Sequence, residues 1–143
     1  MTGMRVLVSG GAGFIGSHLV QALISVGHDV LVYDNLSTGD RRNLIGIYTT
    51  PVGSRLQFAD GDVRHELQLE QTFQGFRPEV VFHLAAQVDV RESVRDPQQD
   101  ATVNVLGTIN VAEAAVRHGV RRLVLASSAA VYGHTNRTAS LDT

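Results

Sequence analysis

The stretch Gly10-Gly11-Ala12-Gly13-Phe14-Ile15-Gly16 decides how this chain folds. It follows an apolar run, residues 5–9, whose lack of alternation is typical of a strand buried on both faces. Beyond it, apolar residues recur at helical spacing over 14–26, and Gly27 predicts the end of that helix. The glycines fit both a G-x-G-x-x-G and a G-x-x-G-x-x-G spacing. A turn of this kind between strand and helix lets the backbone and the helix N-terminus approach a pyrophosphate.

The rest of the chain alternates between predicted strands and predicted helices. Further strands are expected over 29–33, 55–59, 80–84 and 122–126, and helices over 42–48, 66–73 and 93–118, the last starting near Pro97. This alternation predicts an α/β fold, a Rossmann-like doubly wound parallel sheet with at least five strands. We expect residues 1–133 to form a dinucleotide-binding domain and residues 134–143, polar and without period, to form an irregular tail.

Composition narrows the classes of protein that this chain can belong to. Its 143 residues suit one domain, and a net charge of −2 gives no electrostatic footprint for nucleic acid or for an anionic membrane. Cysteine is absent, which excludes disulfides and thiolate chemistry, and the histidines show no metal-ligand spacing. No apolar run reaches the ~18 residues that span a bilayer, so we expect a cytoplasmic protein. All 12 basic residues are arginines, so a mechanism that needs lysine must find it outside this sequence.

Asp34 lies where a dinucleotide-binding fold places an acidic residue for the adenosine ribose. It ends the second predicted strand, 18 residues after Gly16. Its carboxylate would accept from the ribose hydroxyls and repel a 2′-phosphate, which favours NAD over NADP. Arg41 and Arg42 follow closely and keep NADP open as an alternative.

Two more segments follow predicted strands at the edge of the sheet where ligands bind. Asp62 would accept from an adenine amino group, or it is an ordinary turn aspartate. The small residues in Leu84-Ala85-Ala86-Gln87 would let the backbone approach a flat ligand, or they serve close packing. His83 is expected to be a hydrogen-bonded core histidine. Asp96 and Asp100 are expected to compensate a helix dipole.

Six motifs together resemble the extended short-chain dehydrogenase/reductase family of NAD-dependent epimerases and dehydratases. Within that family the similarity is greatest to the UDP-glucose 4-epimerase branch. The motifs cover nearly the whole chain: residues 10–18, 33–39, 61–64, 82–94, 104–108 and 127–133.

The resemblance implies a role for each matching position. Phe14 and Ile15 would lie by the pyrophosphate, and residues 34–39 would hold the adenosine ribose. Asp62 and Val63 would flank the adenine, and residues 84–87 would run beneath the nicotinamide side. Asn104 would brace the cofactor region or serve structure alone. The implied cofactor-binding residues are Gly10, Gly13, Phe14, Ile15, Gly16, Asp34, Asn35, Leu36, Ser37, Thr38, Gly39, Asp62, Val63, Leu84, Ala85, Ala86, Gln87 and Asn104. Ser128 is the implied catalytic residue, beside the reacting hydroxyl of the substrate, and no metal is implied.

The resemblance also implies a reaction, the interconversion of UDP-glucose and UDP-galactose through a transient 4-keto sugar. NAD would take a hydride from C4 and return it to the other face, while a tyrosine of a Tyr-x-x-x-Lys motif removes the hydroxyl proton. That motif is absent here, and Tyr132 belongs to a different one.

We therefore expect the N-terminal part of a longer protein, truncated before the catalytic-tyrosine helix and lacking a C-terminal substrate domain. The segment alone should be inactive, and the full-length protein should be a homodimer that binds a UDP-hexose. The alternatives are an epimerase or dehydratase of another nucleotide sugar, and a non-catalytic NAD-binding module.

Overall fold

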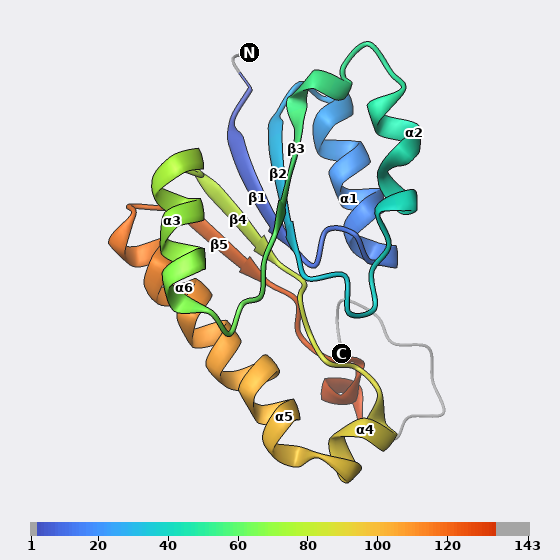
Figure 1. Ribbon diagram of the computed structural model, residues 1–143, viewed down its shortest axis with the longest axis vertical. Coiled ribbons are helices and arrows are strands. Elements are labelled where there is room, and N and C mark those ends of the chain that lie inside the picture. The colour runs from blue at the N-terminus through green and yellow to red at the C-terminus, as the bar shows by residue number, and fades with distance from the viewer. Residues whose placement is uncertain (1–2, 134–143) are drawn as a thin grey trace.

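Five short parallel strands form the centre of the computed structural model, which describes residues 3–133 (Figure 1). They are β1 Arg5–Ser9, β2 Asp29–Asp34, β3 Leu56–Asp60, β4 Val80–His83 and β5 Arg122–Leu125. The spatial order is β3-β2-β1-β4-β5, so β1 pairs with β2 on one side and with β4 on the other. Val8 in β1, for example, is aligned with Val32 and with Phe82. The predicted parallel α/β fold is confirmed, and the predicted tail 134–143 lies outside the described residues.

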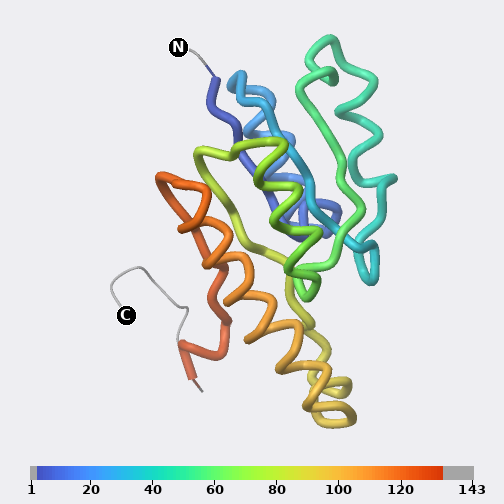
Figure 2. Tube along the Cα trace, turned by 60° about the vertical axis from the view of Figure 1, so that its left-hand side comes forward, coloured from blue at the N-terminus to red at the C-terminus, as the bar shows by residue number. Residues whose placement is uncertain are grey.

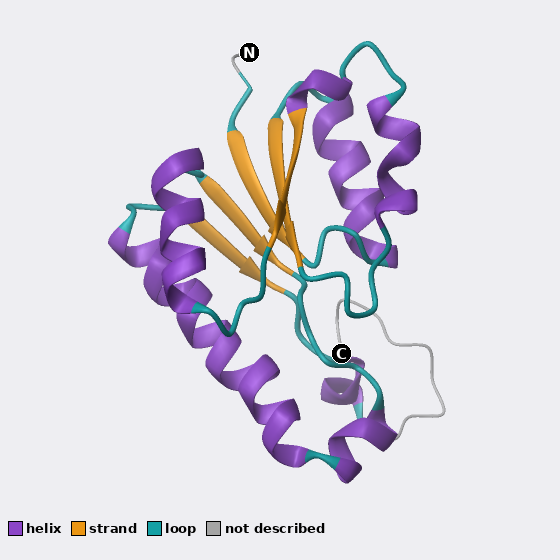
Figure 3. Ribbon diagram, in the orientation of Figure 1, coloured by secondary structure: helices purple, strands orange, loops and turns teal. Residues whose placement is uncertain are grey.

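Helices cover both faces of the sheet, as Figure 3 shows. One face carries α1 Phe14–Ser25 together with a 3₁₀ turn Arg41–Leu44 and the short helix α2 Ile45–Tyr48. The other face carries α3 Glu66–Phe76 and α6 Gly107–Arg117. The sheet separates two hydrophobic cores, and successive residues of β1 point into them alternately. Val6 and Val8 pack in the first core, and Leu7 packs in the second. Burial on both faces explains why the central strands β1 and β2 are nearly continuous apolar runs, whereas β5 at the edge is largely exposed.

The predicted helix over 93–118 divides into several parts. Ser93 belongs to a separate short helix, α4 Val90–Arg95, and the long helical run begins at Pro97 with α5 Pro97–Ala101. The side chain of Asp96 caps α5 by accepting from the N–H of Gln99 at 2.9 Å. A π-helical segment, Thr102–Leu106, then joins α5 to α6. Figure 1 shows this run extending past the carboxyl ends of the strands, and in Figure 2 the segment of α4 lies beside that of α5.

The order in which successive strands are added to the sheet reverses next to β1. From β1 it winds outward to β2 and β3, then returns to place β4 on the opposite side of β1. The loops that follow β1 and β4 therefore part from one another at the carboxyl edge. This is the position at which open α/β sheets bind ligands. In residues 3–133, no helix has the length and apolar character needed to cross a bilayer.

Candidate functional site

A cavity of about 660 Å³ opens at this edge of the sheet, between the loops after β1 and β4. It brings together the glycine-rich turn, the ends of β2 and β3, the loop 84–87 and one side of α4–α5. Of the predicted cofactor-binding residues, its lining holds Gly10, Gly13, Phe14, Ile15, Gly16, Asp34, Asn35, Ser37, Thr38, Gly39, Asp62, Val63, Leu84, Ala85, Ala86 and Gln87. Leu36 is absent from this lining, and its side chain packs against the core on the α1 side of the sheet. Asn104 lines a neighbouring cavity instead.

Two glycines of the turn allow backbone contacts that a side chain would prevent. Gly10 has φ +72°, and a Cβ built on it would lie 2.6 Å from the backbone nitrogen of Ala85. A Cβ on Gly16 would lie 2.2 Å from the carbonyl oxygen of Gly10. The first contact brings the turn against the loop after β4, and the second brings the first turn of α1 against the turn itself. Both surfaces lie on the cavity, which fits a ligand that is held by backbone groups.

The N-terminus of α1 points its free backbone groups at the cavity. Gly13 precedes the helix without a side-chain cap, and the first turn holds no acidic residue. Phe14 and Ile15 are 80% and 70% exposed, so core packing does not explain these apolar residues there. An uncapped helix start with a positive dipole end suits a phosphate group.

Asp34 connects the turn to the segment after β2. Its side chain is buried, with Oδ2 accepting from the N–H of Ala12 at 2.9 Å and Oδ1 accepting from the N–H of Leu36 at 2.8 Å. Leu36 adopts φ +57°, a left-handed conformation that this hydrogen bond supports. Each carboxylate oxygen still has one acceptor site free. Asp34 is therefore both a brace of the turn and an available acceptor at the cavity wall.

Asp62 is held by an arginine that sequence reasoning missed. Arg64 donates to Oδ1 from its backbone N–H and from Nε, both at 2.9 Å, and to Oδ2 from Nη2 at 2.6 Å. Asn35 donates to Oδ2 at 2.9 Å, which fills the four acceptor sites of the carboxylate. The Arg64 hydrogen bonds hold the pKa of Asp62 well below its ordinary range. A contact from this carboxylate to an adenine amino group would need one of these donors to move.

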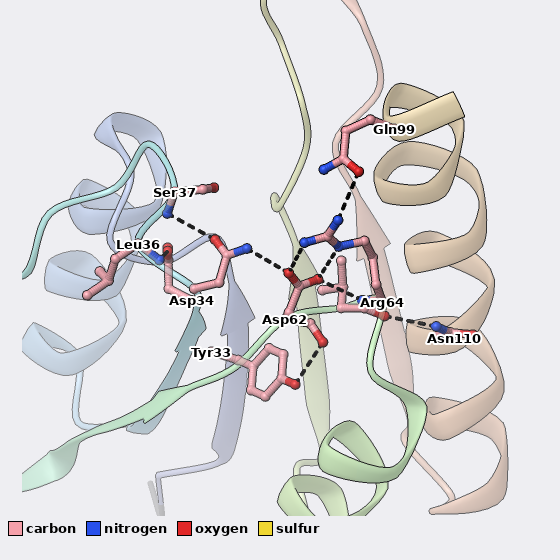
Figure 4. A network of polar contacts seen from close by, with 10 residues as sticks. Tyr33, Asp34, Leu36, Ser37, Asp62, Arg64, Gln99 and Asn110 are labelled. Carbon is pink, nitrogen blue, oxygen red and sulfur yellow. Dashed lines mark hydrogen bonds and ion pairs between the residues drawn. The ribbon is translucent and has the colours of Figure 1, made fainter. Parts of the chain in front are cut away.

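Arg64 also links the segment after β3 to α5. Its Nη1 donates to Oε1 of Gln99 on α5 at 3.0 Å, as Figure 4 shows, and both residues line the cavity. Beneath it, the hydroxyl of Tyr33 donates to the carbonyl of Asp62 at 3.1 Å. Burial and the nearby Asp62 raise the pKa of Tyr33 to about 12. The sequence signal for Arg64 was its place two residues after Asp62, but nothing local indicated Gln99.

The two arginines that leave NADP open as an alternative, Arg41 and Arg42, contact other side chains outside the cavity. The guanidinium of Arg42 donates from Nε to the carboxylate of Asp40 at 2.7 Å. The guanidinium of Arg41 lies 4.0 Å from the ring centroid of Phe58 and 3.9 Å from the carboxylate of Asp60. Neither residue lines the main cavity. The carboxylate of Asp34, by contrast, lines this cavity beside the glycine-rich turn.

The loop 84–87 is fixed by Asn104 from the π-helical segment. The Asn104 side chain accepts from the N–H of Gln87 and donates to its carbonyl, both at 2.9 Å. These residues line the second cavity, of about 640 Å³, which also includes the exposed Ser128. The hydroxyl oxygen of Ser128 accepts from the N–H of Ala130 at 3.1 Å and begins a 3₁₀ turn, Ala129–Tyr132. Among residues 3–133 no cluster of three metal-ligating side chains occurs.

Comparison with known proteins shows which family this chain resembles. Residues 6–143 match the model of the NAD dependent epimerase/dehydratase family. The chain belongs to this family. The resemblance that the sequence motifs carried is thereby confirmed, and so is the Rossmann-like fold that the family shares with solved relatives.

Several relatives of this epimerase/dehydratase chain are UDP-glucose 4-epimerases. The enzyme of Mycolicibacterium smegmatis is 47% identical over 131 residues, which are 91% of this chain and 41% of that protein. The Thermus thermophilus enzyme, solved with NAD, has a TM-score of 0.84 at 45% identity, over 97% of this chain and 43% of that one. The Thermotoga maritima enzyme, solved with UDP-glucose, has a TM-score of 0.82 at 40% identity, over 94% and 41%. This chain thus spans about two fifths of the length of these relatives.

Proposed function

We propose that this chain is the NAD-binding part of a nucleotide-sugar 4-epimerase that interconverts UDP-glucose and UDP-galactose. One observation carries the proposal: the glycine-rich turn, the uncapped start of α1 and the buried Asp34 carboxylate meet in one cavity at the switch point of the sheet. A pyrophosphate and an adenosine ribose are the groups that this combination recognises. The UDP-glucose 4-epimerases among its relatives support the reaction class.

The negative charge of Asp34 near the expected ribose position favours NAD over NADP. Asp34 offers acceptors for two hydroxyls and would repel a 2′-phosphate. Arg42 pairs with Asp40, Arg41 lies over the ring of Phe58, and neither lines the cavity, which further favours NAD. The adenine would lie near Val63 and the Asp62–Arg64 pair, and the nicotinamide near the loop 84–87.

Ser128 is the residue of this chain that we assign to the reacting sugar. When bound, NAD supplies an acceptor for the hydride from sugar C4. The hydroxyl oxygen of Ser128 accepts from Ala130, so its proton remains free to donate to the oxygen of a sugar. Its place in the second cavity, beside the loop 84–87, suits that contact. The tyrosine and lysine that move the proton would come from elsewhere in the complete gene product.

We further propose that residues 1–133 form the cofactor domain and that the complete gene product adds a sugar-nucleotide domain and dimerises. The long helical run supports a dimer, because Val105, Leu106, Ile109 and Val116 lie exposed along it. An exposed apolar face of this kind marks a protein contact.

Turnover with deuterated substrate tests the proposal. The complete gene product is incubated with UDP-glucose that carries deuterium at C4, and the product sugar is analysed by NMR. We expect UDP-galactose that retains the deuterium at C4, because the same cofactor takes and returns it. The 143-residue chain alone should give no turnover. Conversion of only another nucleotide sugar would change the substrate assignment, and NAD binding without any conversion would support a non-catalytic module.

A further inference from the structure

A chain of three hydrogen bonds runs beneath the loop 84–87. The hydroxyl of Ser9, at the end of β1, lies 2.6 Å from Nδ1 of His83, at the end of β4, and both residues are buried. Nε2 of His83 lies 3.0 Å from the hydroxyl of Thr108 on α6. The Thr108 hydroxyl in turn donates to the carbonyl of Asn104 at 2.7 Å. This series of hydrogen bonds therefore connects two central strands, β1 and β4, to the π-helical segment.

The direction of these hydrogen bonds is fixed by the last one. A carbonyl only accepts, so the single proton of the Thr108 hydroxyl is committed to Asn104. Thr108 must then accept from His83, which places the imidazole proton on Nε2. A neutral imidazole has one N–H, so Nδ1 accepts from the Ser9 hydroxyl. Ser9 therefore donates to His83, His83 donates to Thr108, and Thr108 donates to the Asn104 carbonyl.

The end of this chain is the residue that holds the loop 84–87. In the π-helical segment the N–H of Gly107 reaches the carbonyl of Thr102, five residues earlier. The Thr108 hydroxyl fixes the Asn104 carbonyl within that altered ladder. The Asn104 side chain then pairs with both backbone groups of Gln87. Displacing the Asn104 backbone would move this clamp and the cavity wall that it supports.

We propose that Ser9, His83 and Thr108 are positioning residues that set Asn104, and through it the loop 84–87, for the nicotinamide end of the cofactor. The proposal rests on the proposed function, because it assigns that end of NAD to this loop. Asp34 and Asp62, at the adenosine end, share no hydrogen bond with the Ser9–His83–Thr108 chain. The chain of hydrogen bonds should therefore affect binding of the whole dinucleotide and leave its adenosine half alone.

The experiment compares NAD with ADP on variants of the complete gene product freed of cofactor. Thr108→Val removes the hydroxyl and keeps the shape, and Thr108→Ser restores the hydroxyl. Thr72→Val is the matched control, because Thr72 is also half-buried and its hydroxyl donates to the carbonyl four residues earlier, Gln68, at 2.8 Å, on α3 away from the cavity. Titration calorimetry measures both affinities for each variant.

We expect Thr108→Val to lower the affinity for NAD about tenfold and the affinity for ADP less than about twofold. Thr108→Ser and Thr72→Val should bind both ligands with affinities close to those of the wild type. If Thr108→Val loses affinity for NAD and ADP equally, or loses no affinity for NAD, the proposal is overturned. Absence of NAD binding by the wild-type protein would instead refute the proposed function, and this inference with it. A second readout needs no ligand: nitrogen-15 NMR should show His83 protonated on Nε2, and a proton on Nδ1 contradicts the stated direction.

Discussion

Acidification should destabilise the fold through His83. Burial lowers the pKa of His83 from its ordinary 6.5 to about 4, so the folded protein keeps the imidazole neutral where the unfolded chain protonates it. Between these two values the unfolded state binds more protons, and stability therefore rises with pH across this window and is lost as pH falls. Each pKa unit is worth ~1.4 kcal/mol, which gives a loss of about 3 kcal/mol between pH 6.5 and pH 4.

The assay is urea unfolding of the chain at several pH values between 7 and 4, for wild type and for His83→Gln. We expect the variant to be less stable at pH 7, because Ser9 and Thr108 lose their partner. Its stability should fall less steeply with acid, because the glutamine amide does not titrate in this range and the contribution of His83 is removed. Thr72→Val controls for reduced stability without loss of a titratable group and should keep the wild-type pH dependence. Identical pH dependence for wild type and His83→Gln would refute the reasoning.

Three further variants test separate parts of the site. Gly10→Ala should lower the unfolding free energy by at least ~1–3 kcal/mol, because its φ is +72° and the Cβ would contact Ala85; thermal unfolding checks this. Asp34→Ala should weaken NAD more than NADP in the complete gene product, and calorimetry with both ligands gives the ratio. Arg64→Gln should raise the pKa of Asp62 toward its ordinary value, which a carbon-13 NMR titration of that carboxyl detects.

The elements of the fold were predictable because their signals are local. Continuous apolar runs and helical periodicity placed every strand within one residue, and the glycine spacing identified the turn that Gly10 and Gly16 build. His83 was expected to be a satisfied core histidine, and its two hydrogen bonds confirm this. The alternation of elements was enough to predict parallel strands, since crossover helices enforce that arrangement.

The contacts between distant segments at the cavity wall were not predictable, because they join residues far apart in the sequence. Arg64 and Gln99 are 35 residues apart, and only the packing of α5 beyond the sheet brings them together. The π-helical segment Thr102–Leu106 was also missed, since one altered turn leaves hydrophobic periodicity almost unchanged. The second role of Asp34, as an acceptor for the N–H of Ala12, needs the folded turn to exist.

The identity of the bound dinucleotide tests the central claim most directly. The complete gene product is purified without added cofactor and denatured, and the released nucleotides are separated by chromatography and identified by mass spectrometry. The cavity at the switch point, with the Asp34 carboxylate at the ribose position, predicts NAD in near-equal amount to the protein. Release of NADP or a flavin dinucleotide, or failure to bind NAD even when it is supplied, would contradict the account.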